Sequence, residues 1–221
     1  GGGLKGFHTI EYLLWGENAK KSAAALASKP RELEYLVALG KALESDTKAL
    51  LDAWVAGDEP YGKAFYLAGK SGGRLYRQVD AVQQLLNGMI AICDEVANGK
   101  IADPFKSGDP QLVESQFSFN SVPDFADNIR SVKNIYNGAL DKVGPDSLSA
   151  AVRAKDASLD ARVRAEIESA IEAILVISKD GQPFREAIKD PAKRAPIEDA
   201  QTRIRTVMTS LRRDVLPLIV G

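Results

Sequence analysis

Apolar side chains along this 221-residue chain recur every three or four positions, which is the spacing of a buried helical face. The sequence contains no convincing stretch of alternating apolar and polar residues, the pattern typical of a half-buried strand. It therefore predicts an all-α fold. The most regular patterns predict helices at about 5–15, 30–56, 74–98, 122–140, 159–178 and 196–216.

Prolines, glycines and serines indicate where these helices begin and end. Pro30 is expected in a first helical turn, where a missing N–H is tolerated, and Gly99 at a helix stop. Ser147 is expected to cap a short helix, and Pro217 to end or kink the last one. Further short helices are predicted at about 61–67, 148–154 and 184–188, with a loop at 100–121 and a loop or helical extension at 19–28.

Glycine-rich punctuation at 58–73 predicts a linker between two helical parts. Residues 74–221 carry four long helices whose lengths and linkers suit an up-down-up-down four-helix bundle. Residues 1–57 form a partial N-terminal helical half that is expected to pack on that bundle or on a missing partner. The chain opens abruptly on three glycines without a capping signal, so we expect a preceding segment, with any leader, to be missing.

Composition excludes several classes of function. The net charge is −1 and no basic run appears, which predicts no nucleic-acid partner and no membrane-surface binding. Aromatic residues make up 7%, too few to suggest a base-stacking surface. Cys93 is the single cysteine and falls on an apolar stripe, so we expect a small buried side chain rather than a reactive thiol. No signal peptide or membrane-spanning run is apparent.

The first candidate site lies in the helix predicted at the start of the chain. His8 is the only histidine, and Glu11 follows at i+3, which places both side chains on one helical face. Such a pair can hold a metal ion, act as acid and base, or form a buried hydrogen-bonded pair. Gly6 is expected to leave room for a neighbouring backbone.

The second candidate site is a polar stretch that runs from a loop into the helix predicted at 122–140. Ser121 or Asn120 can cap this helix, and Asp124 can complement its dipole. The number of polar groups exceeds what one cap requires. The candidate pocket-lining residues of this stretch are Glu114, Ser115, Ser118, Asn120, Ser121 and Asp124.

The available ligands favour some metals over others. A zinc peptidase of the ordinary kind uses two histidines on one helix, and this chain has one histidine in total. One imidazole with oxygen ligands suits a harder or borderline cation such as iron, while zinc and copper remain alternatives. A missing N-terminal segment would be able to supply further ligands.

Taken together, the two stretches resemble the imelysin family. Gly6, His8 and Glu11 match its Gly-x-His-x-x-Glu hallmark, and Tyr-Leu-Leu-Trp follows as in iron-regulated members. The polar stretch from Glu114 to Phe125, continuing to Gly138, looks like the family's second signature block. The resemblance covers nearly the whole chain. It implies two helical-bundle halves with the histidine motif near their interface, although the helices that should precede the motif are absent here.

This resemblance also implies a place and a role. Family members are periplasmic or are outer-membrane lipoproteins, many are linked to iron uptake or regulation, and the family is named for a peptidase. Our first hypothesis is a non-catalytic protein that binds iron or an iron complex through His8 and Glu11, with possible partners among iron-uptake proteins. The alternatives are a metallopeptidase with Glu11 as general base, and an interaction module without metal. The sequence predicts no oligomeric state.

The spatial prediction that follows is specific. The helix that carries His8 and Glu11 should face the loop at 114–124 across a contact between the two helical halves.

Overall fold

Helices account for all regular secondary structure in residues 4–74, 77–140 and 142–221, the parts of the chain that the computed structural model describes. The predicted all-α fold class is confirmed. The chain divides into two compact units, one formed by Gly1–Gln78 with Ser115–Asn120 and the other by Val79–Glu114 with Ser121–Gly221. The division after Gln78 lies a few residues beyond the linker predicted at 58–73. None of the helices in the described ranges is long and apolar enough to cross a membrane.

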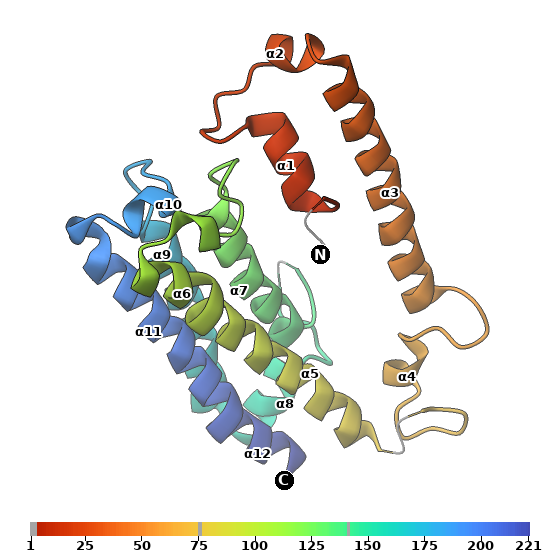
Figure 1. The fold of residues 1–221 in the computed structure, drawn as a ribbon. Helices are drawn as coiled ribbons and strands as arrows, with labels where there is room; N and C mark the ends of the chain where they lie inside the picture. Colours follow the sequence, from red (N-terminus) through yellow and green to blue (C-terminus); the bar gives the residue numbers. More distant parts are fainter. Residues whose placement is uncertain (1–3, 75–76, 141) are drawn as a thin grey trace. The chain divides into compact units, whose positions relative to one another are not determined.

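The first unit contains four helices, α1 (Phe7–Trp15), α2 (Ala23–Ala27), α3 (Pro30–Val55) and α4 (Lys63–Tyr66) (Figure 1). Pro30 stands in the first turn of α3, as predicted. Helix α4 lies within the predicted linker at 58–73 and corresponds to the short helix predicted at 61–67. Aromatic rings fix α4 to the end of α3, because the Trp54 ring lies 4.8 Å from Tyr61 and 6.1 Å from Phe65 between centroids.

This unit buries little apolar surface. Helices α1 and α2 pack against α3, and an ion pair of 2.6 Å between Lys21 and Glu32 joins the α1–α2 connection to α3. Yet Leu39 is the one buried side chain described on α3, while Leu50 and Leu51 are exposed. Since burial of apolar area is the main favourable term in folding, individual polar contacts matter more here than in a well-filled core.

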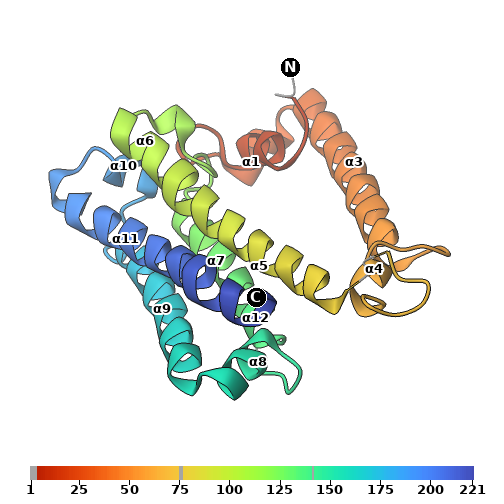
Figure 2. The ribbon, with the colours of Figure 1, turned by 90° about the horizontal axis from the view of Figure 1, so that it is seen from below.

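The second unit holds the core. Its helices are α5 (Gln78–Asp94, beginning at the end of the first unit), α6 (Ala102–Ser107), α7 (Ser121–Asn137), α8 (Leu148–Lys155), α9 (Ala157–Val176), α10 (Phe184–Ala187), α11 (Arg194–Ser210) and α12 (Leu216–Val220). Helix α9 packs against α7 and α11, and α5 contributes Leu86, Met89, Ile90 and Cys93 to the same core. The four long helices α5, α7, α9 and α11 run in alternating directions (Figures 1 and 2). This is the predicted four-helix bundle. Its largest fully buried side chains include Tyr136, Phe125, Phe184, Leu86 and Met89.

The predicted helix stop at Gly99 is wrong. The helix continues through a π-helical segment, Glu95–Ile101, into α6 and ends at Gly108, whose φ of 66° is left-handed. The N–H of Gly108 donates to the Pro104 carbonyl at 2.8 Å and closes the last turn. Val96 and Ile101 are fully buried, so the apolar stripe continues past Gly99 and keeps the chain helical. The loop predicted at 100–121 is correspondingly shorter.

Pro217 does not end the last helix. A π-helical segment, Leu211–Val215, follows α11, and Pro217 then occupies the first turn of α12, which runs on to Val220. A first-turn position requires no N–H donor, so the proline is accommodated there. Gly99 thus lies inside a π-helical segment, and Pro217 lies in the first turn of the helix that follows the other one.

Buried polar groups in this unit are mostly satisfied. The Asp160 side chain is 2% exposed, and its Oδ1 accepts hydrogen bonds from the Ser149 hydroxyl at 2.6 Å and the Tyr136 hydroxyl at 3.1 Å. These bonds join α7, α8 and α9. Burial, followed by the neighbouring Asp160 carboxylate, raises the pKa of Tyr136. Cys93 is fully buried and burial raises its thiol pKa to about 12, so it is the inert buried side chain that its position in the sequence predicts.

The Ser147 cap offers a test of this unit. Its hydroxyl accepts a hydrogen bond from the Ala150 N–H at 3.0 Å, as predicted for the start of α8. Ser147→Ala should lower the free energy of unfolding by about 1 kcal/mol, because the N–H loses its acceptor. Denaturant unfolding followed by circular dichroism measures this. Ser131→Ala in the middle of α7 is the control, and equal effects of the two substitutions would contradict the capping role.

Candidate functional site

The candidate site begins at the glycine that precedes α1. Gly6 has φ 87° and ψ −168°, a backbone conformation that essentially only glycine adopts. A Cβ added at Gly6 would meet no heavy atom of the described residues within 4 Å. The sequence-based expectation of a closely approaching backbone is therefore wrong. Glycine is required here for its conformational freedom, which lets the chain turn into α1.

Glu11 is the most constrained side chain on α1. It is only 7% exposed. Its Oε1 atom accepts three hydrogen bonds, from the backbone N–H of Phe117 at 3.0 Å, the backbone N–H of Ser118 at 2.7 Å and the Ser118 hydroxyl at 2.7 Å. Its Oε2 atom lies 3.1 Å from His8 Nδ1. Four donors from two distant parts of the sequence thus converge on one buried carboxylate.

The donors come from a tight turn at 115–119. Ser115 and Phe119 both have positive φ angles, 51° and 64°, which are uncommon for residues other than glycine. The turn presents two successive backbone N–H groups to the same carboxylate oxygen, an arrangement that binds anions. The Phe117 ring also contacts the Tyr12 ring edge-on, with centroids 5.1 Å apart. The strained turn therefore packs on α1 and serves as its carboxylate's binding site.

The surroundings of Glu11 shift its pKa in opposite directions. Burial raises the pKa, whereas hydrogen bonds from Ser118, His8 and Phe117 lower it, and the result lies below the ordinary value of 4.5. Glu11 is therefore ionised at neutral pH. An ionised carboxylate only accepts hydrogen bonds, so the Nδ1 atom of His8 must carry the proton that it shares with Oε2.

His8 is held by one ring nitrogen and exposed at the rest of the ring. The side chain is 61% exposed, and the pair lies at i,i+3 on one face of α1, as predicted. Because Nδ1 donates to Glu11, the lone pair of a neutral His8 is on Nε2. The motif thus presents a fixed imidazole with its ligating nitrogen available.

This geometry decides which atoms of the motif can bind a metal. Three donors occupy Oε1 of Glu11, whereas Oε2 accepts one hydrogen bond and is the oxygen through which Glu11 would bind a metal. The hydrogen bond to Glu11 engages Nδ1 of His8, so Nε2 is the other nitrogen through which the motif would bind a metal. Within residues 4–74, 77–140 and 142–221, no group of three His, Cys, Asp or Glu side chains is arranged to hold a metal ion. Metal binding itself stays a prediction.

The candidate pocket-lining residues are divided between the two units. Ser115, Ser118 and Asn120 belong to the first unit with Gly6, His8 and Glu11, whereas Glu114, Ser121 and Asp124 belong to the second. That these nine residues line one pocket, at a contact between two halves, stays a prediction. The structure does bring Glu11 and Ser118 into direct contact, although 107 positions separate them.

The three candidate residues of the second unit, Glu114, Ser121 and Asp124, make contacts or occupy positions within that unit. The Glu114 carboxylate pairs with Lys100, whose Nζ lies 3.0 Å from Oε2, and Lys100 also donates to Asn128 at 3.0 Å. Ser121 is the first residue of α7, and its hydroxyl donates to the Glu114 carbonyl. Asp124 lies in the first turn of α7, where a negative charge is favourable.

Two groups that contact candidate site residues, the Phe117 N–H and the Lys100 side chain, were not predicted from the sequence. The Phe117 N–H is a backbone group, and residue type carries no signal for it. Lys100 lay in a segment that the sequence assigned to a loop, so its pairing with Glu114 had no sequence signal.

Comparison with known proteins places the chain in a family. A model of the family described as Imelysin matches residues 3–211. This chain belongs to the imelysin family. The Gly-x-His-x-x-Glu stretch at 6–11, the imelysin motif that the sequence resembles, lies within the matched residues.

Relatives of this imelysin share about a quarter of its residues. It is 28% identical over 218 residues to "Iron-regulated protein A" of Synechococcus elongatus, covering 97% of this chain and 58% of the relative. A crystal structure from Parabacteroides distasonis, classed as an iron-regulated protein A precursor, matches at 28% identity with a TM-score of 0.84 over 98% of this chain and 64% of that one.

A crystal structure of an imelysin peptidase from Bacteroides ovatus matches at 28% identity with a TM-score of 0.68. That match covers 80% of this chain and 51% of the other. The chain thus spans between half and two thirds of the length of the relatives it matches.

The ionised state of Glu11 can be tested by pH. Because its pKa is lower in the folded protein, its contribution to stability is present above the ordinary value of 4.5 and is lost as pH falls through the folded value. Glu11→Gln should lower the free energy of unfolding by about 1.5–3 kcal/mol at neutral pH. This difference from wild type should shrink as pH falls below 4.5. Both tryptophans, Trp15 and Trp54, lie in the first unit, so their fluorescence during denaturation reports on that unit. A difference that stays constant with pH would contradict the assignment.

The role of Gly6 has its own test. Gly6→Ala should destabilise the first unit by about 1–3 kcal/mol, because alanine disfavours the observed φ and ψ. Gly40→Ala in the middle of α3 is a matched control, since nothing lies within 4 Å of its added Cβ and its φ is not positive. That control should be neutral or stabilising by up to about 1 kcal/mol. Equal tryptophan-fluorescence unfolding curves for both variants would refute the conformational argument.

Proposed function

We propose that this imelysin takes part in bacterial iron uptake or its regulation as a non-catalytic binding protein, and that His8 binds an iron complex. The names of its relatives support a link to iron, since two of them are called iron-regulated proteins. The resemblance to exported family members supports a periplasmic location or an outer-membrane lipoprotein. Other proteins of iron uptake are the partners that this role suggests.

The observation that carries the proposal is the fixing of His8 by Glu11. Histidines that bind metals commonly donate their other ring N–H to a carboxylate, which sets the tautomer and makes the ligating nitrogen more basic. Here the carboxylate is buried and held by three donors from the 115–118 turn, while the imidazole is 61% exposed. Burying the Glu11 carboxylate costs free energy, which a side chain that serves only packing would avoid.

The number of ligands favours an iron complex over a bare ion. One available imidazole is a poor site for an aqueous cation, and the described ranges contain no group of three acidic, histidine or cysteine side chains placed to complete one. A chelated ferric ion keeps most of its oxygen ligands and needs only one or two positions from the protein. Zinc and copper, which imidazole also suits, are the competing metals.

The geometry does not favour Glu11 as the general base of a metallopeptidase. A general base needs an oxygen within reach of the attacking water and a pKa near the working pH. The hydrogen bonds to Glu11 occupy both oxygens and leave its pKa below the ordinary glutamate value. We therefore assign Glu11 the positioning of His8.

Titration calorimetry tests this proposal. Wild type, His8→Ala, Glu11→Gln and Glu44→Gln are titrated with ferric nitrilotriacetate, zinc chloride and copper chloride. We expect wild type to bind the ferric complex, His8→Ala to lose binding, and Glu11→Gln to bind about 10–100-fold more weakly. Glu44→Gln removes an exposed carboxylate of α3 and should behave as wild type.

Three results would overturn parts of the proposal. Equal binding by wild type and His8→Ala would show that the site lies elsewhere. Failure of wild type to bind any of the three probes would favour an interaction module in which His8 and Glu11 are structural. Peptide cleavage that is abolished by both a chelator and Glu11→Gln would favour the metallopeptidase.

A further inference from the structure

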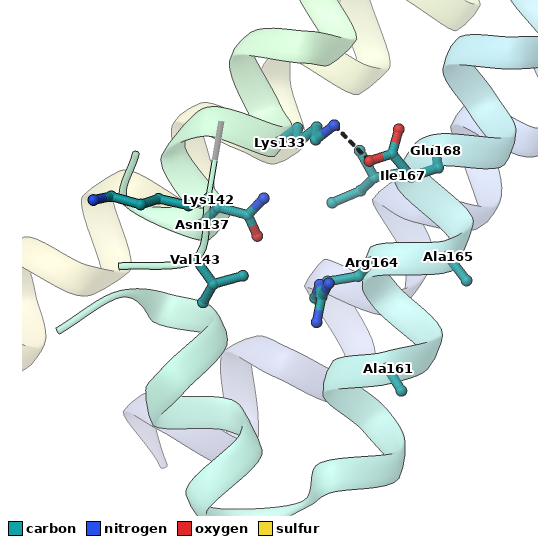
Figure 3. Close-up of a pocket in the computed structure, with 9 residues that line it drawn as sticks. All are labelled: Lys133, Asn137, Lys142, Val143, Ala161, Arg164, Ala165, Ile167 and Glu168. Carbon is teal, nitrogen blue, oxygen red and sulfur yellow. Dashed lines mark ion pairs between the residues drawn. The ribbon is translucent and has the colours of Figure 1, made fainter. Parts of the chain in front are cut away.

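The second unit contains a pocket of about 510 Å³ that the imelysin motif does not use (Figure 3). Helices α7 and α9 and the segment at 142–143 line it. Its polar lining residues are Lys133, Asn137, Arg164 and Glu168, and Val143 and Ile167 are among its apolar ones. All of them belong to the second unit, so the pocket is independent of the site at His8.

Asn137 has a buried amide oxygen that lacks a partner. The residue is 7% exposed and ends α7. Its backbone carbonyl accepts a hydrogen bond from Gly144 at 2.7 Å, but no described residue donates to its side-chain Oδ1. Figure 3 shows the amide directed toward α9, across the pocket. Buried polar side chains are nearly always hydrogen-bonded, so the bare oxygen indicates a missing donor.

Arg164, whose side chain is 47% exposed, supplies a cation on the opposite side of the pocket. Its nearest acid is Asp160, whose Oδ2 lies 4.0 Å away, beyond hydrogen-bond length. The guanidinium makes no hydrogen bond to any residue that the structure describes. It extends from α9 toward the side of the pocket that carries Asn137 and Val143 (Figure 3). A guanidinium has five N–H donors and binds a carboxylate with two of them.

The other charges leave Arg164 as the main attraction for an anion. Lys133 and Glu168 form an ion pair at 2.5 Å and largely cancel each other. Lys142 extends away from Asn137 and Arg164 in Figure 3. Between Arg164 and Asn137 the wall is apolar, with Ile167 and Val143 facing the pocket.

We propose that this pocket binds a small hydroxycarboxylate. Its carboxylate would pair with the Arg164 guanidinium, its hydroxyl would donate to Asn137 Oδ1, and its carbon chain would lie against Ile167 and Val143. The hydroxyl is the required feature, because Asn137 Oδ1 only accepts hydrogen bonds. Inorganic phosphate fits less well, since it offers mainly acceptors at neutral pH and no apolar surface. An amino acid would bring its ammonium group near Arg164.

Two ligands that differ by one hydroxyl test the proposal. Malate and succinate are both dicarboxylates, and succinate lacks the hydroxyl. Calorimetric titration of the whole chain, in a buffer free of carboxylate and phosphate, should show malate binding about tenfold or more tightly than succinate. Inorganic phosphate is titrated in parallel and should bind more weakly than malate.

Variants separate the two contacts. Arg164→Gln should weaken binding of both dicarboxylates about tenfold or more, because the charge-assisted contact is lost. Asn137→Ala should reduce malate binding to the level of succinate and leave succinate unchanged. Arg213→Gln removes an exposed arginine from a position outside the pocket lining and should bind both ligands as wild type does.

Stability provides a second readout. An unpartnered amide does not stabilise the free protein, so Asn137→Ala should melt at the same temperature as wild type or higher. Asn137→Asp keeps the shape and should lose malate binding through repulsion of the anion. The proposal is overturned if wild type does not bind malate at millimolar concentration, if Arg164→Gln binds it unchanged, or if Asn137→Ala still prefers malate to succinate. A lower melting temperature of Asn137→Ala would show that the amide is structural, which also overturns it.

Discussion

The first unit depends on one buried carboxylate. Glu11 accepts two backbone N–H groups and a hydroxyl from a turn more than 100 positions away, and through these bonds the segment 115–120 becomes part of the first unit. Little apolar surface is buried around it, so these charge-assisted hydrogen bonds carry a large share of the unit's cohesion. The positive φ angles of Ser115 and Phe119 are tolerated because the turn gains a carboxylate for its N–H groups.

The same carboxylate sets the tautomer of His8. Because the second oxygen of Glu11 receives the Nδ1–H of His8, the tautomer of the imidazole is set by a side chain that is itself fixed. The glutamate thus holds one ring nitrogen of His8, while the rest of the imidazole stays exposed.

The second unit differs from the first in having a large apolar core. Its apolar core is filled from α5 to α12, and Asp160 shows how its buried polar groups are satisfied, with donors from α7 and α8 on one oxygen. Asn137 Oδ1 is one of several buried side-chain oxygens of this unit that lack a donor, and the half-exposed Arg164 lacks an acceptor at hydrogen-bond distance among the described residues. Both residues line one pocket. The Asn137 oxygen can accept a hydrogen bond and the Arg164 guanidinium can donate to an anion, and the proposed hydroxycarboxylate offers both partners.

Local chemistry in the sequence determined the helical class, the start of α3 at Pro30, the Ser147 cap and the shared face of His8 and Glu11, because each depends on residues within one or two helical turns. Tertiary packing decided the rest. Gly99 stays helical among buried neighbours in a π-helical segment, and Pro217 is accommodated in the first turn of α12. The donors to Glu11 are backbone groups brought from 106 and 107 positions away, a pairing that no local pattern encodes. Likewise, an asparagine without a partner can be recognised only once every group around it has been placed.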